Sequence, residues 1–156
     1  MRQIIILIVL AFLLATSAYA EPATVVKVID GDTLKVATEH GIATIRLYGI
    51  DSPEKSQAHG QAAWDFTISQ VFGKVVDIAP VGRDIFGRTI AIGMVGTQCL
   101  QEQLILQGYA WVYPDYCKER FCQAWTTLQG ISAGNRVGLW ASPAPVRPWE
   151  WRKQSR

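Results

Sequence analysis

Three short runs of β-branched and apolar residues follow one another with very little chain between them, and they restrict the fold more than any other part of the sequence. The runs cover residues 23–29, 33–38 and 42–48, and His40-Gly41 is a turn candidate between the second and the third. Alternation of apolar and polar residues over such lengths predicts strands. Connections this short leave neighbouring strands antiparallel. The first part of the domain is therefore predicted to form an antiparallel meander.

The chain beyond this meander predicts two more strands and three helices. The strands are expected over 74–80 and 88–94, and the helices over 60–72, 98–107 and 121–133. The resulting order, β-β-β-α-β-β-α-α, suits a mainly β fold with α elements (α+β). We expect a five-stranded Greek-key barrel with about three packed helices.

The first 20 residues have the pattern of a cleavable signal peptide. Arg2 precedes an unbroken apolar run over Ile4–Ala15, and Ala18-Tyr19-Ala20 forms an A-x-A cleavage site before Glu21. The alternative is an uncleaved membrane anchor, but a spanning helix needs about 20 apolar residues and this run is shorter. Cleavage predicts a secreted or periplasmic protein without stable membrane association.

The mature chain is expected to divide into a domain over 21–141 and a Pro/Trp-rich C-terminal tail over 142–156. The tail is predicted to be extended and to lie over the domain. The whole chain has 15 Lys and Arg against 13 Asp and Glu, a formal net charge of +2. Because no strongly basic surface follows from this balance, any nucleic-acid binding must come from individually placed arginines. Nothing indicates an obligate dimer, so a monomer is expected.

The three cysteines fit an oxidising compartment, where a disulfide is favoured. Cys117 and Cys122 are close in sequence and form the favoured pair, which leaves Cys99 as a free thiol. Sequence alone leaves the connectivity open. Metal binding is the weaker alternative, because neither His40 nor His59 stands at a ligand spacing from these cysteines.

The residues that carry chemistry lie at the ends of the predicted strands. Asp30-Gly31-Asp32-Thr33 follows the first strand, and Asp51-Ser52-Pro53-Glu54 follows the third. Alternation places Arg46 on the face opposite Ile45 and Leu47. The ordinary interpretation is an Asp-Gly turn with a solvent-facing arginine. However, four acidic groups that converge repel one another unless a cation is present, and oxygen ligands suit Ca²⁺ or Mg²⁺.

A second stretch, Arg83–Arg88, contains Phe86-Gly87-Arg88 directly before a predicted strand. One interpretation is a solvated hairpin with a surface arginine. The other is a phosphate clamp at Arg88, because the guanidinium fork matches phosphate oxygens in two-point geometry.

Taken together and in order, these motifs resemble the staphylococcal nuclease-like (thermonuclease) family. The resemblance rests on Asp30-Gly31-Asp32-Thr33, Ile45-Arg46-Leu47, Ile50-Asp51-Ser52-Pro53-Glu54 and Phe86-Gly87-Arg88, with weaker support from Leu106–Ala110 and Gly138-Leu139-Trp140. It covers about Ala23 to Trp140. It implies an OB-fold barrel and a Ca²⁺-dependent nuclease that acts on DNA and RNA and leaves 3′-phosphate ends.

The resemblance also assigns roles to residues. Asp32 and Asp51 would hold Ca²⁺ through their carboxylates, and Ser52 through its main-chain carbonyl. Glu54 would be the general base or orient the attacking water. Asp30 would shape the site without being a direct ligand.

In the same comparison, Arg46 and Arg88 would clamp the scissile phosphate. The sequence departs from the family at Phe86, where a tyrosine is usual, and at Ile85, where a polar or basic residue is common. A catalytically weak or inactive OB-fold module that binds nucleic acid is therefore the alternative function. Retention of the full set of acidic residues and arginines favours the enzyme.

Overall fold

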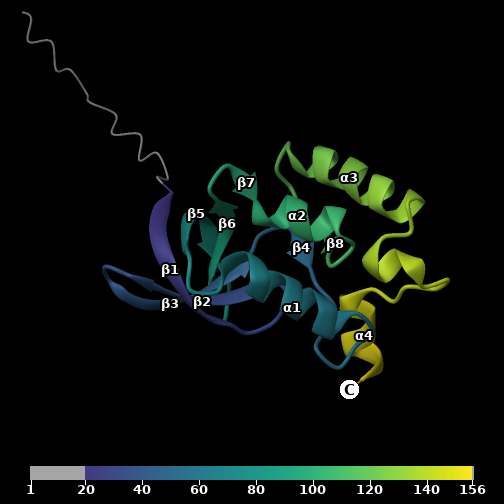
Figure 1. The fold of residues 1–156 in the computed structure, drawn as a ribbon, viewed down its shortest axis with the longest axis horizontal. Coiled ribbons are helices and arrows are strands. Elements are labelled where there is room, and N and C mark those ends of the chain that lie inside the picture. Colours follow the sequence, from purple (N-terminus) through teal and green to yellow (C-terminus); the bar gives the residue numbers. More distant parts are fainter. Residues whose placement is uncertain (1–19, 156) are drawn as a thin grey trace, which may run out of the picture.

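A computed structural model describes residues 20–155, and Figure 1 shows their arrangement. The expected signal peptide falls almost wholly on residues 1–19, which lie outside the described part. Within residues 20–155, no helix is both long enough and apolar enough to cross a membrane.

The β-strands form a closed barrel, as the sequence predicts. One sheet has the order β3-β2-β1-β5-β6-β7, and a parallel pairing between β3 and β6 closes it, so that five longer strands surround the core. The short strands β4 and β8 pair beside the barrel. The strands are β1 (Glu21–Val28), β2 (Thr33–Thr38), β3 (Gly41–Leu47), β4 (Ile50–Asp51), β5 (Val75–Arg83), β6 (Thr89–Val95), β7 (Gln98–Cys99) and β8 (Trp111–Val112).

The helices cover one end and one side of the barrel (Figure 1). They are α1 (Gly60–Val71), α2 (Leu100–Leu106), α3 (Cys122–Gly134) and α4 (Pro148–Gln154), with a 3₁₀ turn over Gly138–Ala141. The first three correspond to the predicted helices. The prediction of an extended tail is wrong for Pro148–Gln154, because proline at the first position and Arg152 and Lys153 in the last turn support a short helix.

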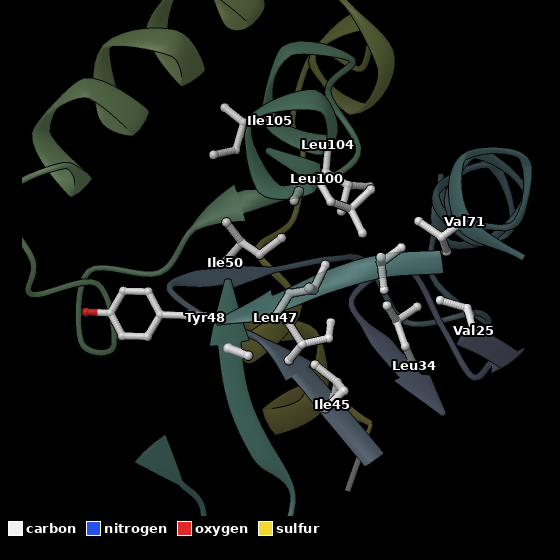
Figure 2. Close-up of a cluster of buried hydrophobic side chains, with 14 of the residues drawn as sticks. Val25, Leu34, Ile45, Leu47, Tyr48, Ile50, Val71, Leu100, Leu104 and Ile105 are labelled. Atoms are coloured by element: carbon white, nitrogen blue, oxygen red, sulfur yellow. The ribbon is translucent and has the colours of Figure 1, made fainter. Parts of the chain in front are cut away.

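The core fills the barrel and the space beneath α2, as Figure 2 shows. Ile45 and Leu47 are fully buried in it, while Arg46 between them faces the opposite side, as alternation predicts. The core therefore fixes the face of β3 from which Arg46 projects.

The predicted disulfide is also present. Cys117 and Cys122 are bonded, with their Cα atoms 5.7 Å apart, and Cys99 is a half-buried free thiol. The loop that the disulfide closes is tied to the barrel, because the main-chain N–H groups of Lys118 and Glu119 donate to the Tyr48 hydroxyl at 2.8 and 3.3 Å. The disulfide closes this loop, and the hydrogen bonds to Tyr48 hold the loop against the end of β3.

Candidate active site

The loop between β1 and β2 brings Asp32 against the segment that follows β4. The Ser52 main-chain N–H donates to Asp32 Oδ2 at 2.6 Å, and Thr33 Oγ1 donates to Asp32 Oδ1 at 3.1 Å. Gly31 makes this approach possible, because a Cβ atom there would lie 2.7 Å from the Ser52 Cβ. Two of the motifs that are separate in sequence therefore meet at one point.

Arg46 joins the two buried aspartates. Its Nη1 lies 3.2 Å from Asp32 Oδ1, and its Nη2 donates to Asp51 Oδ1 at 2.9 Å. Nη1 also donates to the main-chain carbonyls of Leu47 and Ile50 at 3.0 and 2.9 Å. Because these bonds engage most of the guanidinium donors, the side chain is held rigidly at the base of the site.

Burial makes the two aspartates costly to ionise. Desolvation raises the pKa of Asp32 well above its ordinary value, and the charge of Arg46 only partly offsets this. Desolvation likewise raises the pKa of Asp51, against hydrogen bonds and charge from Arg152 and Arg46. Both carboxylates would be stabilised in their ionised form by further positive charge.

Glu54 lies beside Asp51 but is much more exposed. Its side chain is 37% exposed, compared with 2% for Asp51. The main chain around Glu54 is fixed, because its N–H donates to Gln57 Oε1 at 3.2 Å and its carbonyl accepts from the Gln57 N–H at 2.8 Å. A partly exposed carboxylate on a fixed backbone can contact both a water molecule and a bound substrate.

Arg88 occupies the other side of the site, on the hairpin between β5 and β6. Its Nε donates to Asp84 Oδ2 at 2.6 Å, while Asp84 Oδ1 accepts from the main-chain N–H groups of Phe86 and Arg88. Desolvation opposes ionisation of Asp84, but these bonds and the charge of Arg88 lower its pKa overall. Asp84 therefore orients Arg88, whereas Phe86 remains 78% exposed at the tip of the hairpin.

An arginine that the motifs do not include completes the site. Arg152 of α4 donates from Nη2 to Asp51 Oδ2 at 2.7 Å and from Nη1 to Glu54 Oε1 at 2.7 Å. Nη1 also lies 3.2 Å from Asp51 Oδ1. Desolvation disfavours the charged guanidinium, but the hydrogen bonds to both carboxylates raise the pKa of Arg152 overall.

These groups line a cleft of about 750 Å³. Its walls include Tyr113, Tyr116 and the exposed Phe86, so aromatic surface lies next to the charged groups. Burial, and then the charge of Asp51, raise the pKa of the Tyr113 hydroxyl. The cleft thus combines cationic side chains suited to phosphate with aromatic rings suited to bases.

The donors at the base of the cleft fit a hard divalent cation. Asp32 and Asp51 supply buried carboxylate oxygens, and the Ser52 Oγ beside them is buried without a hydrogen-bond partner. No group of three or more His, Cys, Asp or Glu side chains between residues 20 and 155 is arranged as a metal cage. An ion here would therefore also need main-chain or water oxygens, which Ca²⁺ commonly accepts.

The structure brings all of the predicted site residues into this one cleft. Asp30, Asp32, Arg46, Asp51, Ser52, Glu54 and Arg88 all line it. Sequence reasoning missed the contacts of Arg152 and the role of Asp84 in holding Arg88. A proline followed by a short charged segment indicates the start of α4. No sequence pattern indicates where Arg152 would point.

Comparisons with known proteins identify the family of this chain. The family model described as staphylococcal nuclease homologue matches residues 44–142. An uncharacterized endonuclease of Haemophilus influenzae is 35% identical over 152 residues, which cover 97% of this chain and 84% of that protein. A micrococcal nuclease of Shigella flexneri is 29% identical over 141 residues, which cover 85% of this chain and 80% of that protein. The chain therefore belongs to the staphylococcal nuclease family, and it is a nuclease.

The matched region contains β4, Glu54 and the Arg88 hairpin, but it does not include the first and last site residues in the sequence. Asp32 precedes it, and Arg152 lies ten residues beyond its last residue, 142. The resemblance drawn from the motifs is confirmed for the family. Arg152 of α4 lies outside the residues that the family model matches.

Proposed function

We propose that the protein is a secreted or periplasmic, calcium-dependent nuclease that hydrolyses phosphodiester bonds of DNA and RNA and leaves 3′-phosphate ends. The observation that carries this proposal is the pair of buried aspartates, Asp32 and Asp51, bridged by Arg46 beside a partly exposed Glu54. Calcium is abundant outside the cytoplasm, which agrees with the predicted signal peptide.

The residues that would hold calcium are Asp32 and Asp51 through their carboxylates and Ser52 through its main-chain carbonyl. Once bound there, a divalent cation would neutralise charge that builds up on a scissile phosphate. The Ser52 N–H, bonded to Asp32, keeps the two motifs in register. Their relative position therefore does not depend on the ion alone.

The arginines and Glu54 supply the remaining chemistry. Arg46 and Arg88 would bind the phosphoryl oxygens and stabilise the negative charge of the transition state. Glu54 would accept a proton from the attacking water, because its carboxylate lies at the mouth of the cleft where water can enter. Tyr116, which is 61% exposed, offers stacking surface for a base, which would favour single-stranded substrate.

Cleavage of single-stranded DNA and RNA, in calcium and in a chelator, tests this proposal. Glu54→Gln should keep the fold and bind the strand but lose about 10²- to 10⁴-fold in kcat. Arg88→Ala should lose about 10²- to 10³-fold. Matched controls are Glu39→Gln in the exposed turn before β3 and Arg120→Ala in the exposed disulfide loop.

The products should carry 3′-phosphate ends, which a phosphatase-dependent ligation assay detects. Cleavage that persists in the chelator would refute calcium dependence. Unchanged turnover in Glu54→Gln would refute the role given to that carboxylate. A folded protein that binds the strand tightly but never cleaves it would support the binding-module alternative.

A further inference from the structure

The C-terminal helix places a cation on the two carboxylates that the proposed mechanism needs free. Arg152 makes two-point contact with Asp51 through Nη2 to Oδ2 and Nη1 to Oδ1, at 2.7 and 3.2 Å. The same Nη1 donates to Glu54 Oε1 at 2.7 Å. One side chain therefore engages both the proposed calcium ligand and the proposed general base.

Packing, and not this ion pair alone, determines where α4 lies. The Trp149 ring stacks on Tyr113 with centroids 4.4 Å apart and planes within 4°. Pro148 is buried, and Gln57 Nε2 donates to the main-chain carbonyl of Val146 at 2.7 Å. Because these contacts fix the helix, the Arg152 guanidinium is held near Asp51 at a high effective concentration.

The position of Arg152 conflicts with a bound divalent cation. A carboxylate offers about four lone-pair sites, and Arg46 and Arg152 already take three on Asp51. A cation that binds the same oxygens would also be repelled by the guanidinium charge. The Arg152 side chain is 38% exposed, so its own charge stays hydrated when it turns toward solvent, and Arg46 still contacts Asp51.

We propose that Arg152 is a further residue of the active site, a tethered cation that competes with calcium for Asp51 and Glu54 and thereby sets the affinity for the ion. The inference rests on the proposed calcium dependence. In the calcium-free protein Arg152 neutralises the two carboxylates, and calcium takes over this role by displacing it. The same side chain thus stabilises the calcium-free fold and weakens calcium binding.

If Arg152 competes with calcium, its removal should raise the calcium affinity and lower the stability of the calcium-free protein. Arg152→Gln should tighten calcium binding by about tenfold, within the usual range for coupling between two ligands. It should also lower the urea midpoint of the calcium-free protein, because Asp51 and Glu54 lose a partner. A purely structural role would weaken both properties together. Lys153→Gln is the matched control, since it removes the same charge from an exposed neighbour on α4.

Calorimetric titration of the chelator-stripped protein with calcium chloride, without nucleic acid, measures the affinity. Urea unfolding in chelator measures the calcium-free stability. Tighter binding and a lower midpoint in Arg152→Gln, with neither change in Lys153→Gln, would support the competition.

Three other outcomes overturn the inference. Equal calcium affinity in Arg152→Gln and wild type would refute the proposed competition and would leave the proposed calcium dependence intact. Weaker binding in Arg152→Gln would show that Arg152 positions Asp51 for the ion. Absence of calcium binding in every variant would overturn both the inference and the proposed calcium dependence.

Discussion

Substitution of Gly60 by alanine should disable the site without touching any of its charged groups. Gly60 begins α1, and its Cα lies against the main chain of Glu54. A Cβ atom there would fall 1.7 Å from the Glu54 carbonyl oxygen and 2.5 Å from its carbonyl carbon. Cβ contacts in proteins essentially never fall below 3.0 Å, so the oxygen must move by about 1.3 Å.

This displacement gives the expected magnitude. The carbonyl belongs to the proposed general base, and a misplacement of about 1 Å can cost roughly 10²-fold in rate. Overpacking of this kind also lowers the free energy of unfolding by about 1–3 kcal/mol. We therefore expect Gly60→Ala to be folded at low urea but to lose about 10²-fold in kcat/KM.

The control is Gly130→Ala in α3, where a Cβ would have nothing within 4 Å. That change should raise the free energy of unfolding by about 0.5–1 kcal/mol, because alanine has the higher helix propensity, and should leave kcat/KM unchanged. Urea unfolding followed by tryptophan fluorescence, with initial rates of single-strand cleavage, measures both effects. Equal kcat/KM in two folded variants would refute the argument that Gly60 positions Glu54.

Further predictions follow from the disulfide, the buried aspartate and the stacked tryptophan. Replacing Cys117 and Cys122 together by serine should lower the free energy of unfolding by about 2 kcal/mol, the loop-closure value for this short separation, as measured in urea. Burial raises the pKa of Asp32 in the folded protein above its ordinary value of 3.8. The contribution of the Asp32 carboxyl to stability is therefore fully present below pH 3.8, and it is lost as pH rises through the raised pKa. In chelator, the urea midpoint of wild type should therefore fall more steeply between pH 4 and pH 7 than that of Asp32→Asn, and equal slopes in the two proteins would contradict this. Trp149→Ala should release α4 and tighten calcium binding in calorimetry, as Arg152→Gln does, and unchanged affinity would show that Arg152 stays in place without the stack.

The barrel was predictable because its strands carry strong alternation over short connections. A slip of one residue in β3 would move Ile45 and Leu47 out of the core, so the buried pattern determines which way Arg46 points. The same reasoning could not find β4 and β8, since strands of two residues carry no periodicity. The structure shows that this small pairing anchors Asp51, because it sets Asp51 opposite Trp111.

The contacts of Arg152 were beyond sequence reasoning for a different reason. They join residues 98 and 101 positions apart, and no local pattern specifies such a pairing. Proline at the first position of α4 indicates a helix, but the direction of the helix depends on the Trp149–Tyr113 stack. Tertiary packing, and not propensity, therefore brings the arginine to the site.

Burial gives a physical reason why two neighbouring carboxylates would have different roles. Asp51 is 2% exposed and bonded to two arginines, so it cannot readily exchange a proton with water and is suited to hold a cation. Glu54 is 37% exposed and has a single charged partner, so water can reach it. A general base must release its proton to solvent before the next turnover, and Glu54 meets this requirement. The backbone that fixes these two positions, β4 and residues 52–59 before α1, therefore separates the proposed cation-binding carboxylate from the proposed proton acceptor.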